Sequence, residues 1–372
     1  MLMHKFFAVM MLFSALLAPG FSQAAPVYIA SFLPGADFAP TGMNNAGQIV
    51  GFAGTGAVAI HTVLYDGGML SDLGSMGGRD SYALAINDAG DLTGSLVTAN
   101  GEEHAFLYRN GQVTDLGGGT VGYGINARAD IVGKKQTAMG WTGFLFSDGK
   151  LTEIANLDTG LDGCAVGIND HGQIVGESRI AAEMPAPTRH PYLYRQGVMT
   201  DLGALSDGDN NGAVAINNRG QVAGYSEGAD GVMHAFLYQH GALQDLGSLG
   251  DAELTIHDLN EHGTLVGTAS NEDDGLVPFM NLDGALVDLN TLLDPALGWH
   301  IYSAYANNDL GQIVGYGCRD AACGLVRLDL ASAVPAPGGA LLLLAGLPTL
   351  ARARQRQHGR RAAAHAMQRR TA

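Results

Sequence analysis

The line "INDAGDLTG" at 86–94 decides the fold, because close variants of it recur along most of the chain. Consecutive copies start 39–48 residues apart, a period typical of stacked or radial repeat folds. The chain therefore contains seven repeats. The other copies are "MNNAGQIVG" (43–51), "INARADIVG" (125–133), "INDHGQIVG" (168–176), "INNRGQVAG" (216–224), "LNEHGTLVG" (259–267) and "NNDLGQIVG" (307–315).

Each repeat predicts four short strands. In the second repeat, "SYALAIN" leads through a turn to "DLTGSLVT", and "EEHAFLY" leads through "RNG" to "QVTDLG". The pentapeptide "HAFLY" at 104–108 returns unchanged at 234–238. The runs are rich in Val, Ile, Tyr and Phe and bounded by Gly, Asn and Asp, as in strands and hairpins, and none holds an apolar 3.6-residue period. Most of the 54 glycines are expected in turns that need a positive φ.

Four strands in a unit of this length are typical of a β-propeller blade. The first strand of each unit alternates Ala or Gly with larger residues, as crowding around a central axis requires. The last repeat stops after its third strand (323–330), while an unassigned strand opens the region at 27–33. Pairing the two would remove an exposed sheet edge. The sequence thus predicts an all-β, seven-bladed propeller of four-stranded blades over 25–332, closed by the N-terminal strand.

The flanks predict export. Residues 1–24 have the basic start, apolar run and small residues of a secretory signal peptide. At the other end, a linker at 333–337 precedes an apolar run at 338–350 and an arginine-rich tail at 351–372. Positive charge after an apolar run keeps that side of a membrane segment in the cytoplasm. We expect a short transmembrane segment with a cytoplasmic tail in the precursor.

This tail resembles the PEP-CTERM sorting signal of bacteria that have an outer membrane. The resemblance implies an exosortase-like processing enzyme as a partner, and a precursor held in the inner membrane until it is cut near the motif. The repeats resemble the extracellular HAF-repeat family, named for the motif seen at 104–106 and 234–236. That family implies an exported surface or biofilm-matrix protein. The sorting motif consists of Val334, Pro335, Ala336 and Pro337, with Ala where Glu is usual.

Charge agrees with an exported protein that does not bind nucleic acid. All 36 acidic residues but only 12 of the 20 Lys and Arg lie in 25–332, so this region carries a formal net charge of −24. A field of that sign opposes nucleic acids and anionic surfaces, and favours solubility and cations or basic partners.

Three cysteines are present. Cys318 and Cys323 flank the tip of a hairpin in the last repeat, and export permits a disulfide between them. Cys164 occupies a small inner-strand position and is expected to be a buried small hydrophobe.

Features that every blade repeats are expected to be scaffold. Histidines at equivalent third-strand positions lie one to a blade, too far apart to converge on a metal ion, so we expect hydrogen bonds to a neighbouring strand. The turn asparagines are expected to serve each blade in the same way. The histidines are His61, His104, His190 and His234. The asparagines are Asn44, Asn87, Asn126, Asn169, Asn217, Asn260 and Asn308.

Function is expected where the repeat is broken, and "TIHDLN" in the sixth repeat is one such break. His257 and Asp258 stand where the fifth repeat has Val214 and Ala215. They are either a hydrogen-bonded pair lining a wet channel or weak candidates for ligand binding or catalysis.

A second break, "DGDNNG" at 207–212, matches the first half of a calcium-binding loop. Asp207, Asp209 and Asn211 are the candidate ligands. The distal acid of such a loop is replaced by Asn218. A plain polar loop is the alternative to calcium.

Two function classes remain. The chain is either a non-enzymatic propeller that binds extracellular polysaccharide or a surface protein, or a polysaccharide- or ester-directed hydrolase or lyase with its site at the channel. No familiar catalytic motif is present, which favours binding. An enzyme should show polar residues converging at one end of the channel, whereas a scaffold should show its differences between blades scattered.

Overall fold

The computed structural model describes residues 28–331, apart from 57–58, 159–161, 181–187, 207, 209, 251–252 and 271–274. The chain divides into a unit ending at Leu330 and a second unit, 331–372, of which only Ala331 is described. The expected signal peptide, sorting motif, transmembrane segment and basic tail lie outside the described residues. In the described part, no helix has both the length and the apolar character needed to cross a bilayer.

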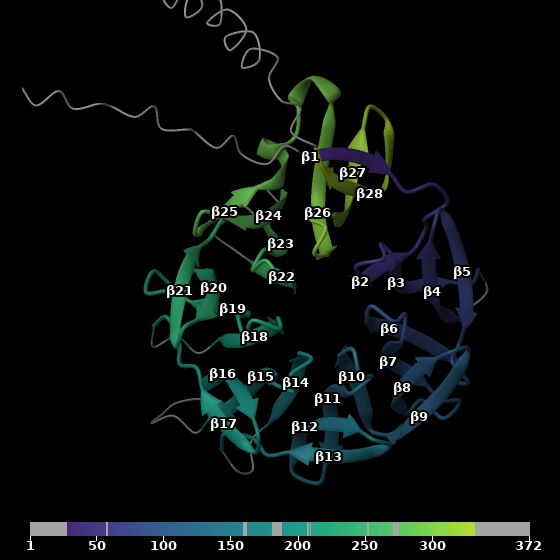
Figure 1. The fold of residues 1–372 in the computed structure, drawn as a ribbon, viewed down its shortest axis with the longest axis vertical. Coiled ribbons are helices and arrows are strands. Elements are labelled where there is room, and N and C mark those ends of the chain that lie inside the picture. Colours follow the sequence, from purple (N-terminus) through teal and green to yellow (C-terminus); the bar gives the residue numbers. More distant parts are fainter. Residues whose placement is uncertain are drawn as a thin grey trace, which may run out of the picture. The chain divides into compact units, whose positions relative to one another are not determined.

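Seven four-stranded antiparallel sheets are arranged around one axis, as the sequence predicts (Figure 1). Inner strands of successive blades contact one another all the way round, and β2 contacts β26 to close the ring. The first six blades, each in inner-to-outer order, are β2 (Ala39–Met43), β3 (Ile49–Gly54), β4 (Ile60–Asp66) and β5 (Met69–Gly74); β6 (Asp80–Ile86), β7 (Leu92–Val97), β8 (Glu103–Arg109) and β9 (Gln112–Gly118); β10 (Thr120–Ile125), β11 (Ile131–Thr137), β12 (Gly140–Ser147) and β13 (Lys150–Ile154); β14 (Gly163–Ile168), β15 (Ile174–Ile180), β16 (Thr188–Arg195) and β17 (Val198–Asp201); β18 (Asn211–Ile216), β19 (Val222–Glu227), β20 (Met233–Gln239) and β21 (Ala242–Gly247); β22 (Leu254–Leu259), β23 (Leu265–Ser270), β24 (Leu276–Leu282) and β25 (Ala285–Asp288).

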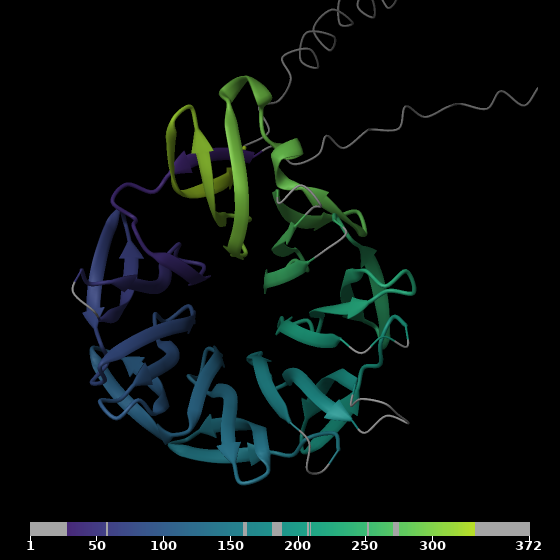
Figure 2. The same cartoon turned by 180° about the vertical axis from the view of Figure 1, so that it is seen from behind.

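The seventh blade joins the two ends of the described chain. It runs from β26 (Trp299–Asn307) through β27 (Ile313–Arg319) and β28 (Ala322–Leu330) to β1 (Tyr28–Phe32), which is the outermost strand. Strand β1 pairs with β28 along its whole length, so the predicted closure by the N-terminal strand is confirmed. Figure 2 shows the same closure from behind. Two short 3-10 helices, η1 (Leu289–Leu292) and η2 (Pro295–Leu297), precede this blade.

The blades pack face to face through the second and third strands. The two apolar residues that open the second strand of blade one point to opposite neighbours: Ile49 packs with Val314 of blade seven, while Val50 packs with Phe106 of blade two. The aromatic residue of "HAFLY" is fully buried between blades, as at Phe106 and Phe236. Apolar area buried on both faces of every sheet is the main stabilising contribution.

Each of the seven repeated lines, such as "INDAGDLTG", which we call turn lines, ends in a glycine. The structure shows why glycine is required there, and the sequence alone did not. Every inner strand contains a β-bulge, which brings a first-strand carbonyl oxygen over the second-strand glycine. A Cβ at Gly94 would lie 1.9 Å from the Tyr82 oxygen, and the seven equivalent distances are 1.9–2.3 Å. These glycines are therefore fixed by a close backbone approach and not by a positive φ. The seven are Gly51, Gly94, Gly133, Gly176, Gly224, Gly267 and Gly315.

Small inner-strand residues reflect crowding at the axis, as expected. A Cβ added at Gly124 would lie 2.9 Å from the Val166 oxygen of the next blade, and one at Gly167 would lie 3.5 Å from the Cα of Ala215. Neighbouring inner strands thus leave room for little more than a methyl group.

Candidate functional site

The ring has two chemically different ends. The turns between the first and second strands of all seven blades lie at one end, which we call the turn end. The first strands begin, and the second strands finish, at the opposite end.

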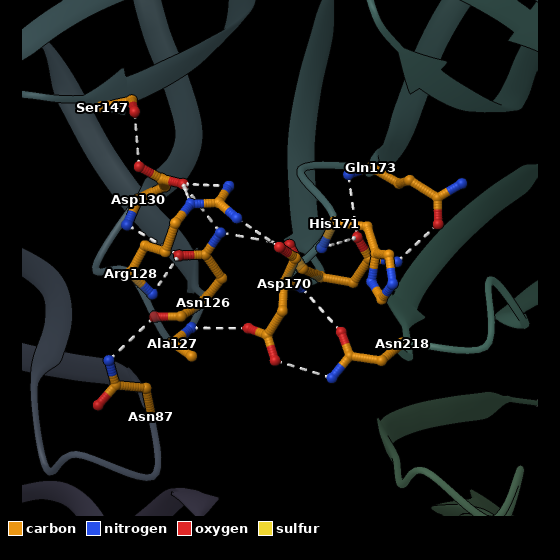
Figure 3. A network of polar contacts seen from close by, with 11 residues as sticks. Asn87, Asn126, Ala127, Arg128, Asp130, Ser147, Asp170, His171, Gln173 and Asn218 are labelled. Atoms are coloured by element: carbon orange, nitrogen blue, oxygen red, sulfur yellow. Dashed lines mark hydrogen bonds and ion pairs between the residues drawn. The ribbon is translucent and has the colours of Figure 1, made fainter.

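Asparagine side chains hold the turn end together. Each turn asparagine accepts two backbone N–H groups of its own turn through Oδ1. Its Nδ2 donates to the backbone oxygen of the equivalent asparagine in the next blade, at 2.9–3.2 Å. The seventh bond runs from Asn308 to Asn44, so the circle is closed. Figure 3 shows the step from Asn87 to Asn126. We call this circle the asparagine ring.

The next residue in each turn forms a second, incomplete ring. A backbone N–H donates to a side-chain oxygen of the following blade in six of seven places, at 2.8–2.9 Å. The exception is the backbone N–H of Asp88, because the following blade has Ala127 at this position and an alanine side chain carries no acceptor. Beside Ala127, Arg128 donates to the backbone oxygen of Asp170 (Figure 3). Together the two rings border a cavity of about 220 Å³.

The candidates His257 and Asp258 do not form a pair. Among the described residues, no hydrogen bond joins them, because His257 is the bulged residue of β22 and its ring lies against Tyr305, at 5.7 Å between ring centres. Burial lowers the pKa of His257. Asp258 accepts the N–H groups of Leu259, at 2.8 Å, and Asn307, at 3.0 Å, so it links blades six and seven. Burial, with a smaller contribution from Asp309, raises the pKa of Asp258 to about 6.

The third-strand histidines are structural, as the sequence reading expects. In each, Nδ1 lies 2.8–3.1 Å from an aspartate of the fourth strand. The same aspartate accepts the N–H of the glycine two residues later at 2.8 Å. This geometry explains why "HAFLY" and "DLG" recur together. The pairs are His61 with Asp72, His104 with Asp115, His190 with Asp201 and His234 with Asp245.

Of the remaining sequence candidates, the structure describes Asn211, Cys318 and Cys323. Asp207 and Asp209 are outside the described residues, and the Asn211 side chain is buried and bonded through Oδ1 to the Ser226 hydroxyl at 2.6 Å. An ion at this loop would have to replace that bond. Cys318 and Cys323 form a disulfide across the β27–β28 hairpin. No group of three or more His, Cys, Asp or Glu in the described part of the chain is arranged to hold a metal ion.

At the opposite end, side chains that differ between blades line a cavity of about 240 Å³ between blades three and four, which we call the cleft. Trp141 of β12 and Lys134 of β11 line one wall, with the Lys134 ammonium 4.5 Å from the centre of the Trp141 ring. Arg179 and Arg189 line the blade-four side. Three of the 12 basic residues of this acidic region therefore meet in one cleft.

Cys164 lies in the wall of this cleft. It was expected to be buried, but it is only partly buried because the cleft opens beside it. Burial still raises the pKa of its thiol to about 12, so the sulfur remains protonated and a poor nucleophile at neutral pH.

A larger cavity of about 480 Å³, the side cavity, lies between blades five and six at the same end. Arg189 lines both cavities. Glu177 fixes the shared wall, because one carboxylate oxygen accepts from Arg189 at 2.9 Å and the other from the Tyr225 hydroxyl at 3.0 Å.

The sequence contained a signal for this site that the repeat analysis did not use. The residue after the glycine of each turn line differs in nearly every blade, although the glycine before it is the same in all seven. Three of these seven residues line a cavity: Lys134 and Glu177 line the cleft, and Tyr225 lines the side cavity. In blade order they are Phe52, Ser95, Lys134, Glu177, Tyr225, Thr268 and Tyr316.

No protein-family model and no curated protein matches the chain. Among solved structures, the β-propeller domain of the Trilobed protease from Pyrococcus furiosus aligns with 16% identity and a TM-score of 0.50, over 68% of this chain and 80% of that one. The acylaminoacyl peptidase of Pyrococcus horikoshii aligns with 12% identity and a TM-score of 0.49, over 80% of this chain and 50% of the peptidase. TolB from Acinetobacter baumannii aligns with 12% identity and a TM-score of 0.45, over 66% and 62%. At these identities the likeness shows the propeller fold alone.

Proposed function

We propose that the protein is an exported propeller that binds an extracellular polysaccharide through the cleft and does not act as an enzyme. One observation carries the proposal: three of the 12 basic residues of the acidic region and the indole of Trp141 converge on one cavity between blades three and four. Scattered positions of these side chains would have favoured a bare scaffold. Convergence favours a ligand site, because aromatic and charged side chains in a concave wall are what small-ligand sites are made of.

The chemistry of the lining residues supports binding over catalysis. Glu177 is engaged by Arg189 and Tyr225, and the thiol of Cys164 is held protonated by burial. A hydrolase would need a free carboxylate pair or an activated nucleophile here. Export and exosortase-like sorting rest on the sequence of 1–24 and 333–372.

Binding to a panel of bacterial matrix polysaccharides tests the proposal. We expect Trp141→Ala to weaken binding at least about tenfold, because an aromatic side chain that a ligand covers often dominates a contact surface. The matched control is Tyr316→Ala, which removes an exposed aromatic of blade seven at the same end and should bind like wild type. Release of new reducing ends or unsaturated sugars during incubation would instead support the hydrolase or lyase alternative.

Processing is tested by mass spectrometry of the exported protein. We expect a mature C-terminus near 334–338. Recovery of peptides from 352–370 in secreted material would contradict sorting and release.

A further inference from the structure

We propose that the ligand is a carboxylated polysaccharide chain that lies across both the cleft and the side cavity, with Arg189 at the point where the two meet. The inference rests on the proposed function, since it assumes that the cleft binds an extracellular sugar polymer. It adds the charge of that polymer and the direction in which it runs across the blades.

Lys134 provides a cation that no protein group neutralises. Its ammonium lies over the ring of Trp141 and 5.8 Å from the centre of the Tyr123 ring. Among the described residues, no carboxylate lies within ion-pair distance of it. Cation–π contacts hold an ammonium in place but leave its full charge available to an anion. Lys134 is therefore positioned to receive a ligand carboxylate.

The two arginines add directional donors. Among the described residues, Arg179 pairs with Asp162, with Nη1 3.9 Å from Oδ2, a distance that is too long for a strong hydrogen bond. Glu177 accepts from one Arg189 nitrogen, Nη1, and so orients the guanidinium. A guanidinium carries five donors in a planar fork that matches a carboxylate. The cleft thus presents three cations: Arg179 and Arg189 are paired with carboxylates of the cleft itself, and Lys134, among the described residues, is not.

The side cavity differs in a way that suits the next part of a sugar chain. Its wall contains apolar side chains, including Met233 and Ile256, beside the polar groups of Asn210 and Thr255 and the carboxylate of Glu253. Sugar rings offer C–H faces to apolar surface and hydroxyls to polar groups at their edges. The volumes, about 240 and 480 Å³, are near the range of roughly 300–1,000 Å³ for small-ligand sites, so each holds a short stretch of such a chain.

Nucleic acid fits the site less well than a polyuronate. Duplex DNA carries about one charge per 1.7 Å of its axis. The formal net charge of −24 over 25–332 opposes every polyanion, a polyuronate included, and the opposition grows with the charge density of the polymer because only three cations gather here. A polyuronate carries one carboxylate per sugar, so its charges are farther apart, and its hydroxyls can bond to the neutral polar groups.

Calorimetric titration of the exported protein with oligogalacturonates tests the inference. The matched ligand is the fully methyl-esterified oligomer of the same length, which keeps the sugars and removes the charge. We expect the free acid to bind at least about tenfold more tightly, and the hexamer more tightly than the dimer because only the longer chain reaches both cavities.

Three variants locate the contact. Arg189→Met is expected to weaken hexamer binding about 10- to 100-fold, and Lys134→Met by about tenfold, since each removes a charge-assisted contact. Lys150→Met is the control, because Lys150 is an exposed lysine of blade three, the blade of Lys134, but lies at the turn end, away from both cavities. Because Arg189→Met leaves Glu177 bonded to the Tyr225 hydroxyl but without its cationic partner, the double variant Arg189→Met with Glu177→Gln separates lost binding from lost stability.

Several outcomes would overturn the inference. Equal binding of the methyl ester would show that charge is not recognised, while leaving sugar binding intact. Equal binding of a single-stranded DNA of the same charge would show that sugar is not recognised. Wild-type affinity in Arg189→Met would remove the bridge between the cavities. Failure of every polysaccharide in the panel, charged or neutral, would instead reject the proposed function itself.

Discussion

The two ends of the ring are made from the same seven repeats, yet they are built on opposite rules. At the turn end, the same asparagine makes the same bonds in every blade, and the circle closes on itself. At the opposite end, the side chains that follow the turn-line glycines change from one blade to the next, and blades three to five use them to line two adjoining cavities. In a repeat protein, the residues that stabilise the fold and the residues that form a binding surface can thus lie at opposite ends of the same strands. Substitutions should then alter stability at one layer and binding at the other.

The largest effect is expected from Gly94→Ala. The new Cβ would overlap the Tyr82 carbonyl oxygen, which is held in the bulge and cannot move aside. We expect a loss of about 3 kcal/mol or more in the free energy of unfolding, measured in urea. Gly54→Ala is the control, since nothing lies within 4 Å of its added Cβ, and it should change stability by less than about 0.5 kcal/mol. A mild effect at Gly94 would mean that the bulge is not rigid.

Replacing one asparagine of the asparagine ring is expected to lower the free energy of unfolding nearly as much as Gly94→Ala does. The loss should be the same in each blade. Asn126→Ala and Asn217→Ala each remove four hydrogen bonds at a buried site. We expect a loss of about 3 kcal/mol for each, because buried donors and acceptors are left unpaired. Sugar binding by the folded variants should be unchanged. Costs that differ by more than about 1 kcal/mol between the two blades would break the equivalence on which the comparison depends.

Asp258 places a carboxyl group at the turn end where the other blades have Ala or Gly. The pH dependence of stability should reveal its contribution. Its folded pKa of about 6 lies above the unfolded value near 4, so its favourable contribution is complete below pH 4 and is lost as the pH rises through 6. We expect the stability of the wild type relative to Asp258→Asn to fall by about 2 kcal/mol between pH 4 and pH 7. Both proteins keep His257, so its opposite titration cancels in the difference. A flat difference would show that water in the cavity screens the carboxylate fully.

The smallest effect is expected at the outer rim. His104→Gln removes a half-exposed contact with Asp115, and exposed pairs contribute little. We expect the melting temperature to change by no more than a few degrees, corresponding to less than about 1 kcal/mol. A larger loss would show that the third-strand histidines contribute to stability as the asparagine ring does.

Much of the turn end could be predicted from the sequence, because its residues recur and a recurring residue has a recurring role. The seven blades, the closure by β1 and the scaffold role of the asparagines and histidines all followed from that periodicity. The cleft could not be found in the same way. Trp141 and Arg189 are far apart in sequence and lie in different blades, so only the packing of those blades brings them to one cavity. The role of Gly94 was also hidden, because a bulge has no sequence signature of its own.

The pairing of β1 with β28 also fixes an order of events in time. Ile29 pairs with Asp329, so the contact that closes the ring joins residues from the beginning and the end of synthesis of the described chain. Strand β1 leaves the ribosome first and then has no partner until all seven repeats have followed. Closing a loop of that length costs about 5 kcal/mol in chain entropy if the intervening blades are unfolded, and less once they are stacked. Six blades are therefore expected to assemble before the seventh. Until β28 has been made, the open edge of β1 is exposed to pairing with another chain.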